Sequence, residues 1–600
     1  MSRILFVMLH PGFVRYYEDG LRGLAAAGHD VHVAFEVSRA KLGEDATAAR
    51  LATWSPRLTC GPAPERAESV RAFLSRGDRT ATRTGETPGR VSAAEAWESL
   101  ATTVRLLTDY LHFFEPAFAG AEGLRSRAEK RLPRIYPPFV RAAARAGAAP
   151  RAVLAAGLRT FERLIPTEPG VDAFLREQRP DLLLVTPLVE LGSQQVDYVK
   201  AARRLGIRNV LCVASWDNLT SKGLMRVVPD HVVVWNDAQK AEAVDLHGAR
   251  PEQVQVTGAQ PFDRWFEARP SRDREAFCRA VGLDPSRPFL LYVGSSSFIA
   301  PDEVPFVERW LSRVARSSDA RIARIGVLIR PHPANARQWR RFDTASFPNV
   351  AVWPPIGTDP NAPDFHRDYY DSLWHSTAVV GINTSAQIEA AIVGRPVLTI
   401  RVPEFAHSQE GTLHFRHLID QGPVSVADSF DAHLSQLAEC LDGIPPQLEA
   451  RRAAFVRRFV RPMGLSTPAA PVFVERITAL GGQPRPLPQA DPWWTAAGRV
   501  PAALIARVAY ALAEDRPLWV YALRPVLAGS AWTLALVDGP GDGWAALAHV
   551  RVRRARRAAW TVWYEATRAV QGYGRRARKA LRRWTRPVEA VVRRATGRTR

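Results

Sequence analysis

The sequence predicts an α/β protein with two domains, each built around a parallel β-sheet, that face each other across a cleft. Two observations lead to this fold class. Short apolar, β-branched runs alternate with helix-length segments, and this pattern occurs once before residue 270 and again after it. A chain of 600 residues is also too long for a single hydrophobic core. The composition, 46% hydrophobic and 24% charged, is that of a folded protein.

The first predicted domain covers residues 1–270. Its opening strand is followed by the loop His10-Pro11-Gly12, a helix, and a second strand, which is the spacing of a β-α-β unit. Residues 60–165 are rich in Ala, Arg, Glu and Leu and are interrupted by prolines, so we expect a helical insertion there. The predicted strands of this domain are 4–9, 31–35, 181–186, 209–214, 231–235 and 253–257.

The second predicted domain covers residues 271–480, with strands at 289–293, 326–329, 349–353, 378–382 and 396–400. From residue 481 the chain is rich in Gly, Pro and Gln, which predicts a linker. The apolar segment 518–537 has the length of a membrane span, but Arg524 and Pro525 interrupt it, so we do not predict a transmembrane helix. Residues 481–600 are therefore interpreted as a linker and a basic, helical, amphipathic C-terminal tail.

Most of the net charge of +21 lies in this tail. Residues 551–600 contain 16 arginines and one lysine against two glutamates, a net charge of +15, and include Trp560, Trp563 and Trp584. Cationic amphipathic segments with tryptophan bind anionic membrane surfaces. We expect peripheral attachment to the inner, cytoplasmic face of a bacterial cell membrane. Nucleic-acid binding by the tail is the alternative, and it does not explain the apolar segment 518–537.

The four cysteines are far apart in the sequence and form no C-x-x-C pair. This spacing argues against a zinc site or a disulfide framework and is typical of a reducing compartment. The first twelve residues lack the pattern of a signal peptide, because the apolar run 4–9 is short and ends at His10-Pro11. The expected location is the cytoplasm.

The most informative stretch is 377–400, which reads as a buried strand, a polar loop, a helix and a second strand. Ligands of open α/β sheets bind at the carboxyl ends of the strands, and helix N-termini favour anions. The loop residues Asn383, Thr384 and Ser385 would meet a diphosphate there, and Glu389, one turn along the helix, would accept hydrogen bonds from ribose hydroxyls. An ordinary capped helix with a solvated glutamate is the alternative interpretation.

Two other predicted strands of the second domain end in polar loops. Arg330 and His332 follow the apolar run 327–329, where a guanidinium can hold phosphate and an imidazole can donate to it or act as an acid or base. Ser295 and Ser296 follow the strand 289–293 and would also approach a phosphate. A structural histidine and a simple polar turn are the alternatives. Together the three loops predict a nucleotide on the second domain.

Candidate catalytic residues of the first domain are His10 and Asp217, either of which could act as a base towards an attacking hydroxyl. Lys222 could balance phosphate charge, and a role for Asp217 as a turn residue is the alternative. After the strand 396–400, Gln409, Glu410 and His414 are candidate sugar-binding residues. The sequence has no Asp-x-Asp pair, no G-x-x-x-x-G-K loop and no H-E-x-x-H motif, so we expect no metal ion and no cofactor besides the donor substrate.

Three motifs resemble known enzymes: R-P-H-P at 330–333, T-S-x-x-x-E-A-x-x-x-G-x-P at 384–396, and V-T-G-A-Q-P-F-D at 256–263. The chain resembles GT-B type glycosyltransferases, which have two Rossmann-like domains. It is similar in particular to the CDP-glycerol glycerophosphotransferase and capsule-polysaccharide branch, and more distantly to UDP-N-acetylglucosamine 2-epimerases. The resemblance covers roughly residues 1–480. It implies that Arg330, His332, Ser385 and Glu389 hold the donor nucleotide and that His10 is the base.

The resemblance is incomplete, because Trp216 to Thr220 stands where glycerophosphotransferases usually have a His-Gly-Thr loop. The expected function is therefore metal-independent transfer of a sugar from a nucleotide-sugar to a cell-surface polysaccharide or lipid-linked acceptor. Glycerophosphate transfer and nucleotide-sugar epimerisation are the alternative activities. A nucleic-acid-binding protein or a scaffold without activity is the alternative outside enzymes.

Overall fold

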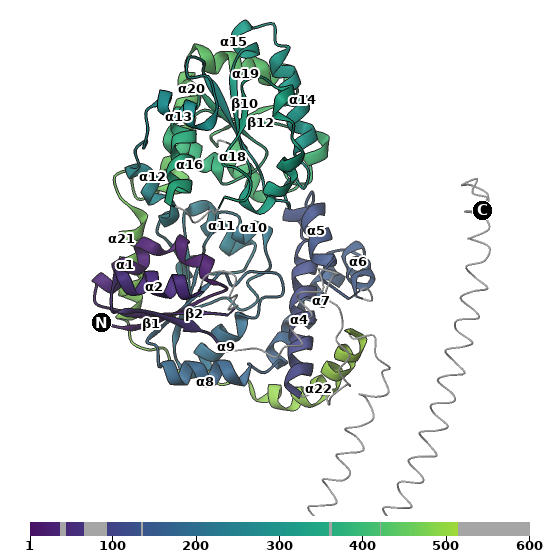
Figure 1. The fold of residues 1–600 in the computed structure, drawn as a ribbon. Coiled ribbons are helices and arrows are strands. Elements are labelled where there is room, and N and C mark those ends of the chain that lie inside the picture. The colour runs from purple at the N-terminus through teal and green to yellow at the C-terminus, as the bar shows by residue number, and fades with distance from the viewer. Residues whose placement is uncertain (37–43, 65–92, 134–135, 359–362, 421, 514–600) are drawn as a thin grey trace, which may run out of the picture. The chain divides into compact units, whose positions relative to one another are not determined.

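The computed structural model of the chain describes residues 1–36, 44–64, 93–133, 136–358, 363–420 and 422–513 (Figure 1). The apolar segment 518–537 and the basic tail 551–600 lie outside the described residues. Among the helices in the described ranges, none has both the length and the apolar character needed to cross a membrane.

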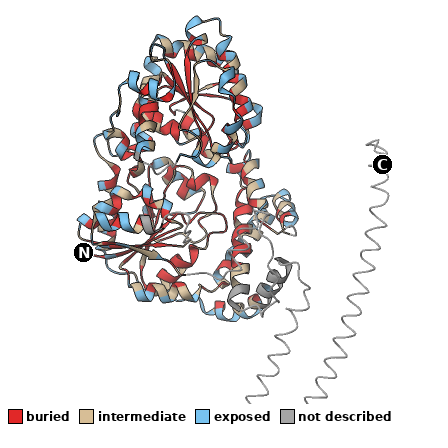
Figure 2. Cartoon of the chain, in the orientation of Figure 1, coloured by how far each residue is buried: buried red, intermediate tan, exposed pale blue. Residues whose placement is uncertain are grey.

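The first sheet has seven parallel strands in the order β3-β2-β1-β4-β5-β6-β7. Both faces are covered, and two clusters of buried apolar side chains fill the space between the sheet and its helices. Figure 2 shows the strands as buried, with exposed residues on the outer sides of the helices. The strands are β1 (Arg3–Met8), β2 (Asp30–Phe35), β3 (Leu58–Pro62), β4 (Leu182–Thr186), β5 (Arg208–Cys212), β6 (His231–Val234) and β7 (Val254–Val256).

The second sheet has six parallel strands in the order β10-β9-β8-β11-β12-β13. They are β8 (Phe289–Val293), β9 (Gly326–Arg330), β10 (Val350–Val352), β11 (Ala378–Gly381), β12 (Val397–Ile400) and β13 (Val424–Ala427). Two parallel sheets, each with helices between successive strands, confirm the predicted α/β fold with two Rossmann-like domains. The edge strands β3 and β13 were not predicted from the sequence.

In each sheet the chain starts near the centre, runs to one edge, and returns to continue on the other side. The order reverses between β1 and β4 in the first sheet and between β8 and β11 in the second. Ligands of open parallel sheets bind outside the carboxyl ends of the strands at such a reversal. His10 follows β1, and the loops at 294–297 and 382–385 follow β8 and β11. His10 and these two loops therefore lie beside the two reversal points.

Helices cover both sheets and connect their strands. In the first domain they are α1 (Glu18–Ala26), α2 (Glu44–Trp54), α8 (Pro169–Gln178), α9 (Val196–Leu205), α10 (Asn218–Ser221), α11 (Asp237–Asp245) and α12 (Asp263–Glu267). In the second they are α13 (Arg274–Val281), α14 (Val304–Ala315), α15 (Ala320–Ala323), α16 (Pro363–His375), α17 (Ala386–Val393), α18 (Leu413–Ile419), α19 (Phe430–Asp442) and α20 (Pro446–Phe455).

The predicted helical insertion is present between β3 and β4. Its described helices are α4 (Ala93–His112), α5 (Glu122–Glu129), α6 (Pro137–Arg145) and α7 (Ala148–Leu164). An apolar cluster around Leu106, Tyr110 and Phe113 joins these helices. Buried charges also connect α4 to α9, a helix that packs on the first sheet. Arg105 of α4 pairs with Glu162 of α7 and with Asp197 of α9.

The chain returns to the first domain after α20. Helix α21 (Ala469–Gly481) lies against α1, and its Phe473 and Ile477 enter the core beneath the first sheet. Asp263 fixes this return by accepting hydrogen bonds from the Arg461 guanidinium and from the backbone N–H groups of Ala469 and Ala470. The sequence analysis placed α21 with the second domain, because a helix pattern does not reveal which core its apolar side enters.

Residues 482–492, predicted to be a linker, follow the surface of the first domain. The Arg208 guanidinium donates to the carbonyl oxygens of Leu480 (2.8 Å) and Pro484 (2.8 Å). Helix α22 (Trp493–Ala513) then packs against α4 and α7 of the insertion. The beginning of the region interpreted as a tail is thus part of the folded first domain.

Candidate functional site

The loops after β8 and β9 lie in direct contact. The Gly294 N–H donates to the Arg330 carbonyl oxygen (2.9 Å). A Cβ atom at Gly294 would lie 2.9 Å from the His332 backbone nitrogen, closer than real side chains come, so this position requires glycine. Two of the three predicted phosphate-binding loops are therefore held side by side at the carboxyl end of the sheet.

Ser295 is buried beneath the loop that follows β8 and is not exposed at the carboxyl end of the sheet. Its side chain is fully buried, and its N–H donates to the Glu303 carboxylate (2.8 Å). Among the described residues, neither Ser295 Oγ nor Glu303 Oε2 has a hydrogen-bond partner. Burial raises the pKa of Glu303 to about 8. The predicted nucleotide contact of the Ser295 side chain is not supported, whereas Ser296 is half-buried at the edge of the loop.

Arg330 is placed differently from the prediction. Its guanidinium is buried beneath α16, where it donates to Ser372 Oγ (3.2 Å) and to the Phe365 carbonyl oxygen (3.0 Å). The rings of Phe365 and Tyr369 each lie 4.9 Å from it. Burial lowers its pKa to about 10, which still leaves it protonated at neutral pH. Arg330 therefore supplies positive charge from behind the site and does not extend as a bidentate phosphate clamp.

His332 lies at the start of the turn that follows β9. Its Nδ1 accepts a hydrogen bond from the Ala334 N–H (3.1 Å), which fixes the ring and leaves Nε2 as the nitrogen able to meet a ligand. Burial, followed by the positive charge of Arg15, lowers its pKa. A neutral imidazole at this position can donate a hydrogen bond to a phosphate, but it adds no charge.

The loop after β11 leads into α17 and presents Ser385 to solvent. Ser385 is the N-cap residue of α17, and its side chain makes no capping hydrogen bond. Thr384 is half-buried, and its hydroxyl accepts from the Ala386 N–H (3.4 Å). Asn383 is buried and donates to the Ser408 carbonyl oxygen (2.7 Å), so it supports the loop from below. The N–H groups of Gln387 and Ile388 donate to the carbonyl oxygens of Thr384 and Ser385, so the exposed Ser385 is the part of this loop that can reach a ligand.

Glu389 is the centre of a charged cluster formed by both domains. Its carboxylate accepts a hydrogen bond from the Tyr369 hydroxyl. Burial raises its pKa to about 7, and this rise is opposed by the Tyr369 hydrogen bond and by three arginines, Arg264, Arg15 and Arg330. Arg15 follows β1 and Arg264 belongs to α12, so two of these cations come from the first domain.

The raised pKa of Glu389 predicts a pH dependence of stability. Because the folded protein binds this proton more tightly than the unfolded chain, the free energy of unfolding should fall as the pH rises from about 4.5 to about 7. A shift of this size corresponds to about 3 kcal/mol. Glu389→Gln should remove this component in urea titrations at pH 5 and pH 8, and Glu410→Gln at an exposed position should not. Parallel pH profiles for wild type and Glu389→Gln would contradict the shift.

In the first domain, His10 is the N-cap residue of the turn after β1. Its Nδ1 accepts from the Gly12 N–H (3.2 Å), and its ring lies against Phe13 (4.7 Å between centroids). His10 and His332 thus make the same local arrangement in the two domains, a histidine whose Nδ1 accepts the N–H two residues on. The ring of His10 is half-buried and held in a single orientation.

Asp217 has a supporting role in its loop. Its carboxylate accepts hydrogen bonds from Ser215 Oγ (2.6 Å) and Ser221 Oγ (2.7 Å). Burial alone would raise its pKa, but Lys222, His414 and the two hydroxyls lower it to about 2. A carboxylate of this pKa is a weak base at neutral pH. The predicted alternative, a turn residue, describes Asp217 better than a general base does.

The predicted sugar-binding residues are not brought together as a group. Gln409 is fully buried and donates to the Ile400 carbonyl oxygen (3.1 Å), so it fastens the end of β12. Glu410 is exposed and pairs with Arg401 (3.3 Å). His414 alone lies between the domains, with its ring 4.8 Å from that of Trp216.

Lys222 and His414 belong to the same region as Asp217. Lys222 forms an ion pair with Glu190 (2.9 Å), a residue that follows β4. Burial lowers the pKa of His414 to about 4, so its ring is neutral. His414 Nε2 lies 3.4 Å from Asn383 Nδ2, which connects this group to the loop before α17. The carboxyl-end loops of the two sheets therefore meet, as predicted for two facing domains.

Sequence reasoning missed Arg15, Arg264 and Tyr369. Arg15 lies in the first turn after β1, and Arg264 directly follows the G-A-Q-P-F-D segment, so each adjoins a motif already singled out. Only the fold brings them to Glu389, which is 374 positions from Arg15 in the chain. Within the described ranges, no group of three His, Cys, Asp or Glu residues is arranged to hold a metal ion.

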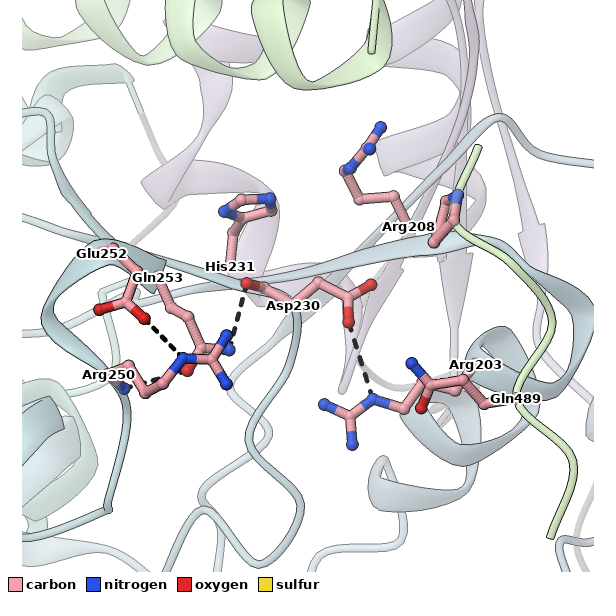
Figure 3. A pocket seen from close by; sticks show the side chains of 9 residues that line it. Arg203, Arg208, Asp230, His231, Arg250, Glu252, Gln253 and Gln489 are labelled. Atoms are coloured by element: carbon pink, nitrogen blue, oxygen red, sulfur yellow. Dashed lines mark hydrogen bonds and ion pairs between the residues drawn. The ribbon is translucent and has the colours of Figure 1, made fainter. Parts of the chain in front are cut away.

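A cavity of about 490 Å³ lies at the opposite, amino end of the first sheet. Figure 3 shows its lining, which includes Arg208 and His231 at the starts of β5 and β6. Arg250 pairs with Glu252 (2.6 Å), and Arg203 lies 3.7 Å from Asp230. Four of its charged side chains are paired with one another, and the cavity is remote from the carboxyl ends of the strands, so we do not place the functional site there.

No protein-family model matches the sequence, and no curated protein matches it. Among solved structures, the chain is similar to UDP-GlcNAc 2-epimerase from Methanocaldococcus jannaschii, with 11% identity over 80% of this chain and 99% of that chain and a TM-score of 0.43. It is similar to a glycosyltransferase from Rickettsia africae (8% identity, 80% and 97% covered, TM-score 0.41). It is also similar to the calicheamicin glycosyltransferase CalG4 (13%, 81% and 100% covered, TM-score 0.41). At these identities and TM-scores the likeness assigns neither activity to the chain.

Proposed function

We propose that this protein is a metal-independent glycosyltransferase that uses a nucleotide-sugar donor. The observation that carries the proposal is the cluster around Glu389 at the reversal point of the second sheet. Three arginines, one carboxylate and the N-terminus of α17 occupy the place where open parallel sheets bind ligands. Such a set matches a nucleoside diphosphate, which combines strong negative charge with neutral hydroxyl groups.

The positive groups fit the diphosphate. Arg15 and Arg264 are exposed, and both act on the pKa of Glu389, so their guanidinium groups lie near the start of α17. Guanidinium groups bind phosphate through strong, charge-assisted hydrogen bonds. His332 Nε2 can add a neutral hydrogen bond. These groups would neutralise the charge that develops on the leaving diphosphate.

Glu389 fits the ribose. A phosphate would repel a carboxylate that it touched. Glu389 lies one turn into α17, where its carboxylate can instead accept hydrogen bonds from ribose hydroxyls. Tyr369 holds the carboxylate in place through its hydroxyl. The arginines oppose the effect of burial on the pKa of Glu389, which is about 7, so the carboxyl group is only partly ionised near neutral pH in the free protein. Diphosphate binding offsets their charge, so donor binding near pH 7 should be accompanied by proton uptake.

The acceptor would bind to the first domain. In the transfer step, an acceptor hydroxyl oxygen bonds to the anomeric carbon, the bond from that carbon to the diphosphate oxygen breaks, and the hydroxyl proton passes to a base. His10 is the proposed base, because it follows β1 at the reversal point. Its Nε2 can take the proton only in the tautomer that carries a proton on Nδ1, so the ring would have to give up the hydrogen bond from the Gly12 N–H. The low pKa of Asp217 assigns it to loop support.

Epimerisation of the nucleotide-sugar is the competing activity, since it uses the same donor and needs no acceptor. A thermal-shift screen against UDP-, GDP-, CDP- and dTDP-linked sugars first identifies the donor. The identified donor is then incubated with the protein alone and with lipid-linked or glycan acceptors. Release of nucleoside diphosphate only with an acceptor supports transfer. A change in the sugar without an acceptor identifies an epimerase, and CDP-glycerol as the only ligand identifies a glycerophosphotransferase.

The acceptor is proposed to be a lipid-linked or cell-surface glycan of a bacterial cell envelope. The support is the composition of residues 551–600, whose charge of +15 with interspersed tryptophans is typical of peripheral binding to anionic membranes. A transferase with this substrate must work at the cytoplasmic face of the membrane. Nucleic acid remains the competing partner for a segment of this charge, and salt-dependent DNA binding without affinity for anionic lipid would favour it.

A further inference from the structure

Among the described residues, the most exposed large hydrophobic side chains belong mainly to the insertion helices α6 and α7 and to the segment around the start of α22. Apart from Met1, every described large hydrophobic residue that is at least 70% exposed lies either on α6 and α7 or between residues 487 and 500. They are Phe139 (70%), Val153 (73%), Leu487 (84%), Trp493 (87%) and Val500 (75%). Folded proteins rarely expose large apolar patches without a binding role.

Helix α22 directs its apolar side outwards. Thr495 is buried, and Arg499 donates from its inner side to the Leu164 carbonyl oxygen (3.1 Å). A Cβ atom at Gly498 would lie 2.6 Å from Leu164 Cδ2, so glycine permits close contact with the end of α7. The exposed residues of α22 up to position 505 are all apolar: Trp493, Ala496, Ala497, Val500, Pro501 and Ile505.

Helices α6 and α7 present apolar and basic residues together. Between residues 137 and 164 the only acidic residue is Glu162, which is buried. The exposed side chains there include Phe139 and Val153 and the arginines Arg145, Arg159 and Arg163. In the described part of the chain, these three arginines form no ion pair. Helix α7 contacts both α6 and α22. We call the exposed residues of these three helices the α6–α7–α22 surface.

We propose that the α6–α7–α22 surface docks onto an anionic lipid bilayer. A surface of aromatic and aliphatic side chains with only positive charges matches the boundary between headgroups and acyl chains. A second copy of the chain would bring like charges together, and the C-terminal tail carries +15 and would be repelled in the same way. Nucleic acid would satisfy the arginines but not Trp493, Val500 and Phe139.

This docking surface is distinct from the basic tail and does not depend on the proposed donor chemistry. It would fix one orientation of the folded protein on the membrane, whereas the tail alone would act as a tether. Residues 514–600 follow α22 directly in the chain, so the α6–α7–α22 surface and the basic tail would bind to the same bilayer.

The test follows an environment-sensitive dye on this surface in the full-length chain. Val153→Cys carries the dye in a Cys60→Ser background, and the control carries it at Met463→Cys, which is exposed elsewhere. On adding vesicles that contain phosphatidylglycerol, the emission at position 153 should shift to the blue and that at 463 should not. Vesicles of phosphatidylcholine alone should give a much smaller shift.

A second measurement uses vesicle flotation. Phe139→Ser, Val153→Ser and Trp493→Ser in combination should lower the partition coefficient about tenfold or more, since three apolar side chains no longer transfer from water into the bilayer. Met463→Ser with Leu465→Ser is the matched control. All of these side chains are exposed, so the melting temperature should be unchanged. Thermal shifts with nucleotide-sugars should also be unchanged, which separates this proposal from the proposed activity.

Two results would overturn the proposal. If the full-length protein floats with vesicles while the emission at position 153 stays as in buffer, the tail alone binds the membrane. If the emission is already blue-shifted without lipid, the surface is covered by the tail or by a second copy. A dependence of that emission on protein concentration would identify the second copy.

Discussion

Replacing Arg105 with methionine is expected to lower the free energy of unfolding by about 3–5 kcal/mol, the usual cost of removing one partner from a buried ion pair. Arg105 is 1% exposed and joins α4 to α7 and α9. Its guanidinium donates two hydrogen bonds to Glu162 (3.0 Å each) and one of 2.6 Å to Asp197. Methionine fills much of the same volume, so the expected loss comes mainly from two buried carboxylates deprived of their shared cation.

The control for Arg105→Met is Arg57→Met, which breaks the exposed ion pair with Asp30. That change should cost no more than about 1 kcal/mol. The pH dependence gives an independent check. Without Arg105, only Lys200 opposes the effect of burial on Glu162, so the pKa of Glu162 rises, the folded variant takes up a proton and its deficit should be smaller at pH 5 than at pH 8. A cost below 1 kcal/mol in urea titrations at pH 8 would show that the pair does not hold the insertion in place.

The fold was predictable where strands are buried on both faces. Such strands are nearly continuous apolar runs, as at residues 182–185 and 327–329, and these were recognised. The two strands that were missed, β3 (Leu58–Pro62) and β13 (Val424–Ala427), are at the edges of their sheets. Edge strands pack on fewer neighbours and tolerate polar residues, Gly and Pro, so their sequences lack a clear apolar run.

The loops of the candidate site were predictable, but the directions of their side chains were not. Successive side chains of a strand point to opposite faces, and a one-residue difference decides whether the last residue meets solvent or a helix. Arg330 is the last residue of β9 and lies beneath α16. Gln409 is likewise buried, because its amide satisfies backbone groups at the ends of β11 and β12.

The contribution of the first domain was not predictable from sequence, because it depends on how the chain crosses between the domains. Arg264 lies near enough to Glu389 to lower its pKa, because Asp263 fixes the start of α12 to Arg461 and α12 packs against α17. These residues are far apart in the sequence, and no local pattern connects them. The same holds for α21, whose apolar side enters the core of the first domain.

Replacing both Arg15 and Arg264 with alanine is expected to weaken the binding of the donor nucleotide by about 100-fold or more. A hydrogen bond to a charged group contributes roughly 1.5–3 kcal/mol, and two lost contacts to a diphosphate together exceed the roughly 2.7 kcal/mol that corresponds to 100-fold. Both side chains are exposed in the free protein, so the melting temperature should change little. Isothermal titration with the nucleoside diphosphate identified in the thermal-shift screen measures the affinity and, in buffers of different ionisation enthalpy, the proton uptake by Glu389.

The matched control is Arg22→Ala with Arg269→Ala, which removes the same two charges from exposed positions of the same domain. If the net charge of the domain alone attracted the donor, both pairs of substitutions would weaken binding equally. If the nucleotide bound to the second domain without the first, neither pair would have an effect. Only a donor held by both domains at once predicts a large loss for Arg15→Ala with Arg264→Ala and a small one for the control. That outcome would place the diphosphate where the two reversal points meet, within reach of His10.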